Sequence, residues 1–305
     1  MTPDSARPFV DILPAVAEAL GDGRQVVALE STIITHGMPY PQNAAMAGKV
    51  EQIVRDEGAV PATIAVIDGR LKIGLTGDER EALAQVDNAM KLSRADLAFA
   101  VSQKRTGGTT VAATMMAAHL AGIRVFATGG IGGVHKGAEE SFDISADLDE
   151  LARTPVIVVS AGAKAILDIE KTLEVLETRG VPVVAVGSDM MPAFWSRQSP
   201  YRAPLRVDHP QAIARLFSTR RALGLEGGML VANPVPESDE IPADVMASYI
   251  AAAHRAAEEQ KVVGKAVTPF LLARLLELTD GESLKTNIAL VENNARLAAR
   301  IARAL

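Results

Sequence analysis

The chain has 305 residues, of which 48% are hydrophobic and only 4% aromatic, and its formal net charge is −6 at pH 7. A core built from Ala, Val, Ile and Leu is typical of helices packed on a largely parallel sheet, so we predict an α/β fold. The acidic balance and the scattered basic residues argue against a nucleic-acid binder, and the lack of cysteine excludes disulfides and thiolate metal sites. Small molecules are the expected partners, and oxygen or imidazole ligands would favour a hard cation.

The first fourteen residues contain Asp4 and Asp11 and no apolar segment, so we predict no secretory signal. No uninterrupted apolar stretch reaches about 18 residues, so we predict no membrane span. The expected location is therefore the cytoplasm. The length allows one or two domains, and we treat residues 1–305 as a single α/β domain.

Short β-branched runs alternate with helical patterns along the chain, which predicts βαβ units and a mostly parallel central sheet in a three-layer α/β/α fold. Helical spacing of apolar residues is clear at 46–54 and at 284–301. Asp68-Gly69, flanked by alternating apolar residues, predicts an added β-hairpin near residues 62–74. The predicted strands are residues 25–29, 62–67, 97–101, 124–128, 155–160, 182–186 and 228–232.

Four polar or glycine-rich stretches follow predicted strands, and ligands of parallel α/β sheets bind outside the carboxyl ends of the strands. The first contains Glu30 at the end of an apolar run. A carboxyl group in an apolar setting tends to stay protonated, so Glu30 is a candidate proton donor. Alternatively, it is a carboxylate held by backbone amides. His36, before the turn at Pro39, is predicted to be a structural loop histidine.

The second stretch comprises Lys91 and residues 104–111, where Gly107 and Gly108 precede hydroxyl residues and a helical run at 112–121. Such a pattern directs amides and a helix N-terminus toward an anion such as phosphate. It lacks the order of a nucleotide P-loop, so no nucleoside triphosphate is implied. The alternative is that the two glycines serve a turn and Lys91 is a solvated charge.

The third stretch, residues 128–137, is rich in glycine but lacks a full dinucleotide fingerprint, so we reject a Rossmann cofactor site. Its glycines would let the backbone approach a small ligand. Asp143, Ser145 and Asp147 offer oxygen atoms to a hard cation or to sugar hydroxyls, and such a cation would keep most of its waters. Alternatively, Ser145 or Asp147 caps a helix.

The fourth stretch is Gly162-Ala163-Lys164, after an apolar run that ends at Ala161. A lysine between a buried strand and a helix sits in a partly dry environment, which favours a nucleophilic neutral amine. The alternative is a surface lysine that opens a solvated helix. Asn287, in a distant helical segment, could hydrogen-bond a uracil-like or amide edge, or only water.

Several long motifs resemble those of the pseudouridine-5′-phosphate glycosidase family, whose superfamily also contains the A component of indigoidine biosynthesis. The resemblance extends from about Val10 to Leu305, with no departure at a motif position. The motifs that carry it are Val27-Ala-Leu-Glu-Ser-Thr-Ile-Ile-Thr-His-Gly-Met-Pro39, residues 58–65, Phe126-Ala-Thr-Gly-Gly-Ile-Gly-Gly-Val-His135, Phe142-Asp-Ile-Ser-Ala-Asp147, Ala161-Gly-Ala-Lys164 and Thr268-Pro-Phe-Leu-Leu-Ala-Arg274.

The resemblance implies that Lys164 is the covalent nucleophile, Glu30 the proton donor, Lys91 a catalytic and substrate-contacting lysine, and Asp143 the Mn²⁺ site, with Mg²⁺ as the alternative metal. No organic cofactor is expected, and the family resemblance implies a homotrimer with an α/β fold. The further positions implied to bind substrate are Thr110, Val111, Ser145, Ala146, Asp147, His135 and Asn287.

The implied reaction is the reversible cleavage of the carbon–carbon glycosidic bond of pseudouridine 5′-phosphate to ribose 5-phosphate and uracil. A bond from C1′ to a ring carbon offers no leaving heteroatom to protonate, so the usual route with two carboxylates is closed. A lysine imine on the ring-opened ribose would supply the electron sink. The rival hypotheses are an aldolase-like Schiff-base enzyme acting on another phosphosugar, and a phosphosugar-binding protein without activity.

Overall fold

The computed structural model, which describes residues 5–262 and 264–305, contains an 11-stranded sheet. The main path runs in the order β1-β4-β3-β2-β7-β8-β11-β9-β10, and β6 joins β3 to β5 beside it. Neighbouring strands are parallel except at the β3–β4 and β3–β6 pairs. The strands are β1 (Val10–Ile12), β2 (Val26–Leu29), β3 (Val60–Ile67), β4 (Arg70–Ile73), β5 (Met90–Leu92), β6 (Gly107–Thr109), β7 (Val125–Ala127), β8 (Ile157–Ser160), β9 (Val183–Val186), β10 (Leu205–Val207) and β11 (Met229–Ala232).

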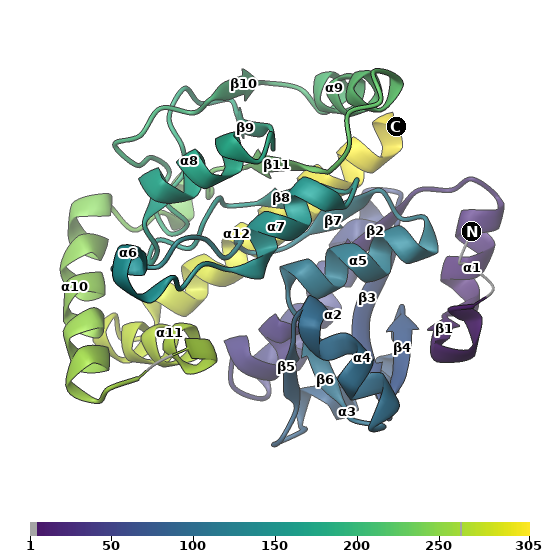
Figure 1. Cartoon of the computed structure of the whole chain (residues 1–305), viewed down its shortest axis with the longest axis horizontal. Coiled ribbons are helices and arrows are strands. Elements are labelled where there is room, and N and C mark those ends of the chain that lie inside the picture. Colours follow the sequence, from purple (N-terminus) through teal and green to yellow (C-terminus); the bar gives the residue numbers. More distant parts are fainter. Residues whose placement is uncertain (1–4, 263) are drawn as a thin grey trace.

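Helices cover both faces of this sheet, as Figure 1 shows: α5 and α7 lie in front of the strands, and the long helix α12 crosses behind them. The predicted α/β/α class with a mostly parallel sheet is therefore confirmed. The α-helices are α1 (Pro14–Gly21), α2 (Gln42–Asp56), α3 (Gly77–Ala84), α4 (Arg94–Ser102), α5 (Val111–Ala121), α6 (Ala138–Ser141), α7 (Ala146–Arg153), α8 (Ile169–Thr178), α9 (Pro210–Ala222), α10 (Ala243–Glu259), α11 (Val267–Leu278) and α12 (Glu282–Ala304). Short turns of other helical types are η1 (Arg7–Phe9), η2 (Ile33–Gly37), η3 (Glu237–Asp239) and η4 (Gly264–Ala266).

The central strands are apolar because both of their faces are covered. Every residue of β2, β7, β8 and β11 is buried. Helix α12 contacts β7, β8, β2 and α2, so the stripe of apolar residues predicted at 284–301 packs on the sheet. None of the described helices is both long enough and apolar enough to cross a bilayer.

The predicted hairpin is present and is formed by β3 and β4. Its turn residues Asp68 and Gly69 have φ angles of 49° and 75°, the left-handed conformation that a two-residue turn between twisted strands requires. A side chain at Gly69 would also collide with the Val101 carbonyl oxygen, 2.6 Å from the position of a Cβ atom. The hairpin is part of the sheet, because β3 also pairs in parallel with β2.

The strand predicted at 97–101 is wrong, because these residues lie in helix α4. A carboxylate oxygen of Asp96 accepts the Ser93 amide at 2.9 Å, an interaction that starts a helix. Leu97 and Ala100, three residues apart, are buried, whereas Phe99 is 57% exposed. A strand would have placed Leu97 and Phe99 on one face.

Candidate active site

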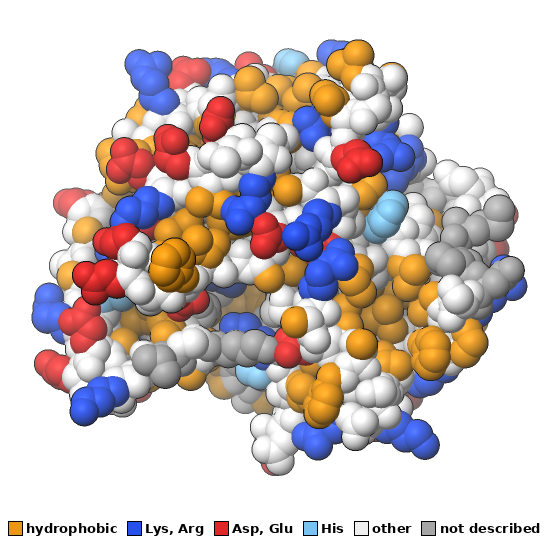
Figure 2. Space-filling model, viewed as in Figure 1, with side chains coloured by type: hydrophobic (Ala, Val, Ile, Leu, Met, Phe, Trp, Pro, Cys, Tyr) orange, Lys and Arg blue, Asp and Glu red, His pale blue; other side chains and the backbone are white. Residues whose placement is uncertain are grey.

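The predicted site residues line a hollow at the carboxyl edge of the strands, with about 1030 Å³ of open space. Figure 2 shows this face of the molecule recessed between α10–α11 and β5–β6, with Lys or Arg side chains visible inside. An adjoining chamber shares Glu30, Lys91 and Lys164 with the hollow and is also lined by Asn287. The predicted residues on the wall of the main hollow are Glu30, Lys91, Thr110, Val111, His135, Asp143, Ser145, Ala146, Asp147 and Lys164.

Lys164 lies on a connecting loop between β8 and α8. This agrees with its predicted place between a buried strand and a helix, whereas the alternative of a lysine that opens the helix is wrong, because α8 begins only at Ile169. Backbone hydrogen bonds fix the loop: the Lys164 amide donates to the Ile131 carbonyl at 3.1 Å, and the Ile131 amide donates to the Gly162 carbonyl at 3.0 Å. The side chain is half-buried and reaches both chambers. The fixed backbone of the loop therefore directs the Lys164 side chain into the space that a ligand would occupy.

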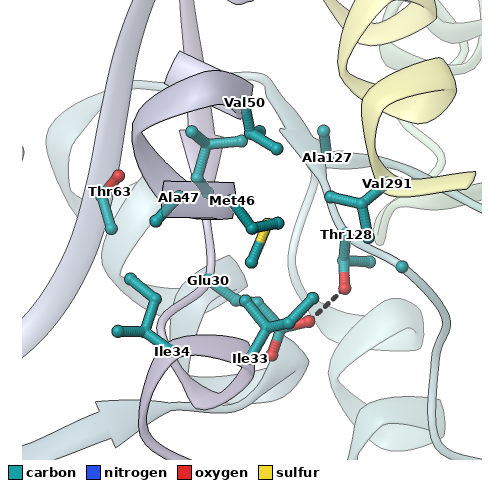
Figure 3. Close-up of a pocket in the computed structure, with 12 residues that line it drawn as sticks. Glu30, Ile33, Ile34, Met46, Ala47, Val50, Thr63, Ala127, Thr128 and Val291 are labelled. Carbon is teal, nitrogen blue, oxygen red and sulfur yellow. Dashed lines mark hydrogen bonds between the residues drawn. The ribbon is translucent and has the colours of Figure 1, made fainter. Parts of the chain in front are cut away.

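Glu30 follows the last residue of β2, and two threonine hydroxyls bind its carboxylate. Thr32 donates to Oε2 and Thr128, from the end of β7, donates to Oε1. Figure 3 shows the Thr128 contact, with Ile33 and Met46 packed around the carboxyl group. The expected alternatives were an apolar setting or backbone amides, but the structure combines apolar neighbours with hydroxyl donors.

The Thr32 hydroxyl has a second acceptor, the Thr109 carbonyl oxygen at 3.2 Å. A hydroxyl carries one hydrogen, so Thr32 can donate either to Glu30 or to Thr109. When Glu30 is ionised, Thr32 donates to it. When Glu30 is protonated on Oε2, its O–H can donate to Thr32, which then donates to Thr109. The local hydrogen bonds therefore accommodate both protonation states of Glu30.

Lys91 lies on β5 and contributes positive charge to the hollow beside Lys164. Burial lowers the pKa of His135, whose side chain is 16% exposed. Asp143 opposes this shift, and the charges of Lys91 and Lys164 add to it. Burial and the nearby Lys91 likewise lower the pKa of His36. Both imidazoles are therefore mainly neutral at pH 7 and can accept as well as donate a hydrogen bond.

His36 was predicted to be a structural loop histidine, and it lies in the short turn η2. Its Nδ1 is 2.7 Å from the Thr35 hydroxyl, which fixes the ring. The same side chain lines the chamber that contains Lys91, Lys164 and Asn287. The structure therefore adds His36 to the wall of the site.

The N-termini of α5 and α7 form the polar end of the hollow. Thr110 and Ser145 are the N-caps, and their hydroxyl oxygens accept the amides of Ala113 and Asp147 at 3.5 and 3.2 Å. Each hydroxyl hydrogen is left to donate elsewhere. Hydroxyl groups and helix N-termini are suited to a phosphate group.

Asp147 joins these two helices to the glycine-rich third stretch. Its Oδ1 accepts the Ala112 amide at 2.9 Å and its Oδ2 accepts the Gly132 amide at 2.8 Å. The expected cap is thus supplied by Ser145, and the Asp147 carboxylate is engaged by the protein backbone instead of being open to a cation.

Gly107 and Gly108 lie in β6, so they form a strand and not a loop or a turn. A Cβ atom at Gly107 would lie 2.4 Å from the Met90 carbonyl oxygen, and one at Gly108 would lie 2.3 Å from the Thr35 hydroxyl oxygen. The glycines therefore allow β6 to pack against β5 and η2. Their effect on the site is indirect, because this packing brings Thr110 and Lys91 to the hollow.

Replacing Gly132 with alanine is expected to damage the polar end. The new Cβ would lie 2.2 Å from the Ser145 hydroxyl oxygen and 2.8 Å from Asp147 Oδ2, so both side chains must move. Overpacking of this kind costs about 1–3 kcal/mol. We expect a lower melting temperature and a higher KM for a phosphorylated substrate. Gly21→Ala, with nothing within 4 Å of its Cβ, is the control; equal KM in both variants would contradict this prediction.

Asp143 is the carboxylate of the hollow best suited to a metal. Both oxygens of Glu30 and of Asp147 accept hydrogen bonds, whereas the Asp143 side chain is 40% exposed and lies 3.9 Å from His135 Nδ1. Within residues 5–262 and 264–305, no group of three or more His, Asp or Glu side chains could hold a metal. This donor set fits a hydrated hard cation and does not fit a metal held by protein atoms alone.

Sequence reasoning missed five further residues at the site. Thr32, Ser93 and Thr268 line the hollow, Phe194 lines the adjoining chamber, and Thr128 binds Glu30. Thr128 directly follows β7, so the rule that ligands bind at strand ends could have found it. Phe194 has no comparable signal, because it lies in an irregular segment after β9 and reaches the site only through the fold.

Comparison with known proteins identifies close relatives. A family model described as indigoidine synthase A like protein matches residues 15–304. A protein from Mesorhizobium japonicum named pseudouridine-5′-phosphate glycosidase is 75% identical over 305 residues, covering 100% of both chains. One of the same name from Paracoccus denitrificans is 63% identical over 300 residues, covering 98% of this chain and 99% of its own.

Solved structures share the fold. The prealnumycin C-glycosynthase AlnA, in complex with ribulose 5-phosphate, has a TM-score of 0.90 and 37% identity, covering 99% of this chain and 98% of its own. An indigoidine synthase A-like protein from Thermotoga maritima has a TM-score of 0.88 and 34% identity, covering 96% of this chain and 95% of its own.

Proposed function

The chain belongs to the indigoidine synthase A-like family, and from this premise we propose that it is an enzyme that reversibly cleaves pseudouridine 5′-phosphate to ribose 5-phosphate and uracil. The observation that carries the proposal is the meeting of Lys164, Glu30 and Lys91 in one hollow whose far end is suited to a phosphate group. Two relatives named pseudouridine-5′-phosphate glycosidase, 75% and 63% identical to this chain, support the choice of pseudouridine 5′-phosphate as the substrate.

Lys164 is the proposed nucleophile. Its amine attacks C1′ as the bond from C1′ to the ring oxygen breaks, and the ring oxygen takes up a proton. The nitrogen lone pair then forms a C1′=N imine as the C1′–C5 bond breaks toward a protonated uracil C5. Water adds to the imine and releases ribose 5-phosphate as its aldehyde, so the sum is substrate plus water to two products. The AlnA complex with ribulose 5-phosphate, a pentose phosphate that cannot close into a furanose through C1, supports an open-chain sugar at this site.

Lys91 assists Lys164 in this proposal. Lys91 and Lys164 both line the main hollow and the adjoining chamber, and the charges of both lower the pKa of His135. These observations support their proximity. Lys91 also has the charge to contact the substrate.

Glu30 is the proposed proton donor to uracil C5 and to the ring oxygen. A group with this role must gain and lose a proton in each turnover. Thr32 makes both states possible, because its hydroxyl can donate to the carboxylate or to the Thr109 carbonyl. Asn287 lines the same chamber, where it would bind the uracil edge.

At the polar end, we propose that the 5′-phosphate is bound by Thr110, Val111 and the segment 145–147. A hydrated Mn²⁺ or Mg²⁺ would be held by Asp143, with His135 beside it. When bound, such a cation supplies positive charge next to the oxygens of the phosphosugar.

The single α/β domain is likewise a proposal, supported by one cluster of buried side chains that extends from Val16 to Ala302. The homotrimer rests on the family resemblance alone. The cytoplasmic location stays a prediction. Light scattering of the purified protein tests the trimer directly.

The test is incubation of the protein with pseudouridine 5′-phosphate and Mn²⁺, followed by chromatography for uracil and ribose 5-phosphate. We expect equal amounts of both products, and the reverse mixture should yield pseudouridine 5′-phosphate. No uracil release would contradict the proposed function and would favour an aldolase-like enzyme for another phosphosugar.

A further inference from the structure

Asn294 is a fully buried polar residue of α12 that has no place in the mechanism above. Its side-chain amide donates to the Thr128 carbonyl at 2.8 Å, and the Gly129 carbonyl lies 3.4 Å away. Its side-chain oxygen accepts Asn233 Nδ2 at 3.0 Å. Buried polar groups are normally hydrogen-bonded, and here the side-chain nitrogen of Asn294 holds the Thr128–Gly129 backbone while its side-chain oxygen is held by Asn233.

The segment that Asn294 holds is the one that positions Glu30. Thr128 leaves β7 with its amide bonded to the Val159 carbonyl at 3.0 Å, and the Gly129 carbonyl accepts the Ala161 amide at 2.8 Å. These bonds fix the backbone on the side of β8. Asn294 fixes it from the side of α12, and the Thr128 hydroxyl then donates to Glu30 Oε1.

The two threonines that bind Glu30 therefore differ in kind. Thr32 has an alternative acceptor, whereas the Thr128 hydroxyl is directed at Glu30 by a backbone held from two sides. Asn233 connects Asn294 to a third strand, because Asn233 directly follows β11. Its backbone amide donates to the Ser160 carbonyl at 2.8 Å.

We propose that Asn294 is a positioning residue for the reaction: held by Asn233, it fixes the Thr128–Gly129 backbone and so keeps Thr128 as the constant hydrogen-bond donor to Glu30. This inference rests on the proposed function, because it assigns Asn294 to the proton-transfer step of that reaction. Asn294 touches neither Glu30 nor the hollow, and it acts through Thr128.

The test compares Asn294→Ala with Asn293→Ala. Asn293 is the neighbouring residue on α12 and donates to the Pro234 carbonyl at 3.0 Å, so its loss also removes one hydrogen bond between a side chain and the backbone. We expect Asn294→Ala to lower kcat for pseudouridine 5′-phosphate by about 10- to 100-fold, the effect of a small misplacement of a catalytic group, with KM changed less than about twofold. Asn293→Ala should keep the wild-type kcat.

A double-mutant cycle with Thr128→Val separates positioning from a general loss of structure. If Asn294 acts through Thr128, the double variant loses little more kcat than Thr128→Val alone. Thr128→Ser, which keeps the hydroxyl, should recover most of the activity of Thr128→Val. Asn233→Ala, which removes the side chain that holds Asn294, should lower kcat by a smaller factor. If Asn294→Ala does not fold, the kcat of Asn233→Ala tests the proposal in its place.

Additive effects in the cycle, or equal kcat in the Asn294 and Asn293 variants, would overturn the proposal while leaving the proposed function intact. Failure of the unaltered protein to release uracil would instead overturn the proposed function. A melting temperature measured for each variant shows that the kinetic differences are compared among folded proteins.

Discussion

Replacing Lys164 with alanine is expected to abolish turnover of pseudouridine 5′-phosphate. The variant loses the amine that forms the imine, and removal of a covalent nucleophile costs on the order of 10⁵- to 10⁶-fold in kcat. Stability should change little, because the half-buried side chain points into the hollow and the loop is held by backbone bonds. The measurement is uracil release, together with mass spectrometry after borohydride reduction in the presence of ribose 5-phosphate. We expect a sugar-phosphate adduct on Lys164 in the unaltered protein.

Two further variants make this test specific. Lys164→Arg keeps a positive charge but cannot form an imine, because the guanidinium stays protonated, so it should be as inactive as the alanine variant. Lys171→Ala removes an exposed lysine of α8 that pairs with Glu139 at 2.8 Å, and it should keep full activity. Substantial activity in Lys164→Arg, or an adduct on another lysine, would rule out Lys164 as the nucleophile.

Replacing Glu30 with glutamine is expected to lower kcat by about 10²- to 10⁴-fold, the usual contribution of a general acid or base. Glutamine keeps the size of the side chain and one acceptor oxygen, so binding should suffer less than turnover. The amide cannot deliver a proton to uracil C5. Steady-state kinetics with pseudouridine 5′-phosphate, which give kcat and KM separately, are the measurement.

A matched control for Glu30 is available in Glu51, a buried carboxylate that also accepts a threonine hydroxyl. Glu51 Oε1 accepts Thr63 at 2.7 Å, and Oε2 pairs with Arg80 at 2.7 Å, away from the main hollow. Glu51→Gln should lower the melting temperature and leave the activity of the folded enzyme intact. If Glu30→Gln and Glu51→Gln lost kcat equally, a catalytic role for Glu30 would have no support.

The position of the site could be predicted from the sequence, because the ends of apolar strands are visible in a few consecutive residues and ligands bind at the carboxyl ends of parallel strands. Glu30 and Lys164 follow apolar runs, and the carboxyl ends of parallel strands share one edge of the sheet. The turn at Asp68-Gly69 was predictable for the same reason, since its signal is contained in two residues. Short apolar runs are weaker signals. Residues 97–101 fit a strand or a helix until the Ser93–Asp96 interaction is taken into account.

The hydrogen bonds around Glu30 could not be predicted because they join residues far apart in the chain. Thr128 is 98 positions from Glu30, and Asn294 is 166 positions from Thr128. Which hydroxyl meets which carboxylate depends on the register of β2 against β7 and on the rotation of α12 above them. A single sequence specifies neither of these in a local pattern. The same holds for Gly107 and Gly108, whose role depends on the neighbours of β6.

All strands of the sheet precede α12 in the chain, and this order has a consequence for synthesis on the ribosome. Strands β7 and β8 are complete before the helix that covers one of their faces has been made. A nascent chain that ends before Glu282 exposes that apolar face, a state prone to misassembly and a target for chaperones. Because Asn294 arrives with the same helix, the backbone that directs Thr128 toward Glu30 is fixed only after every other part of the site has been synthesised.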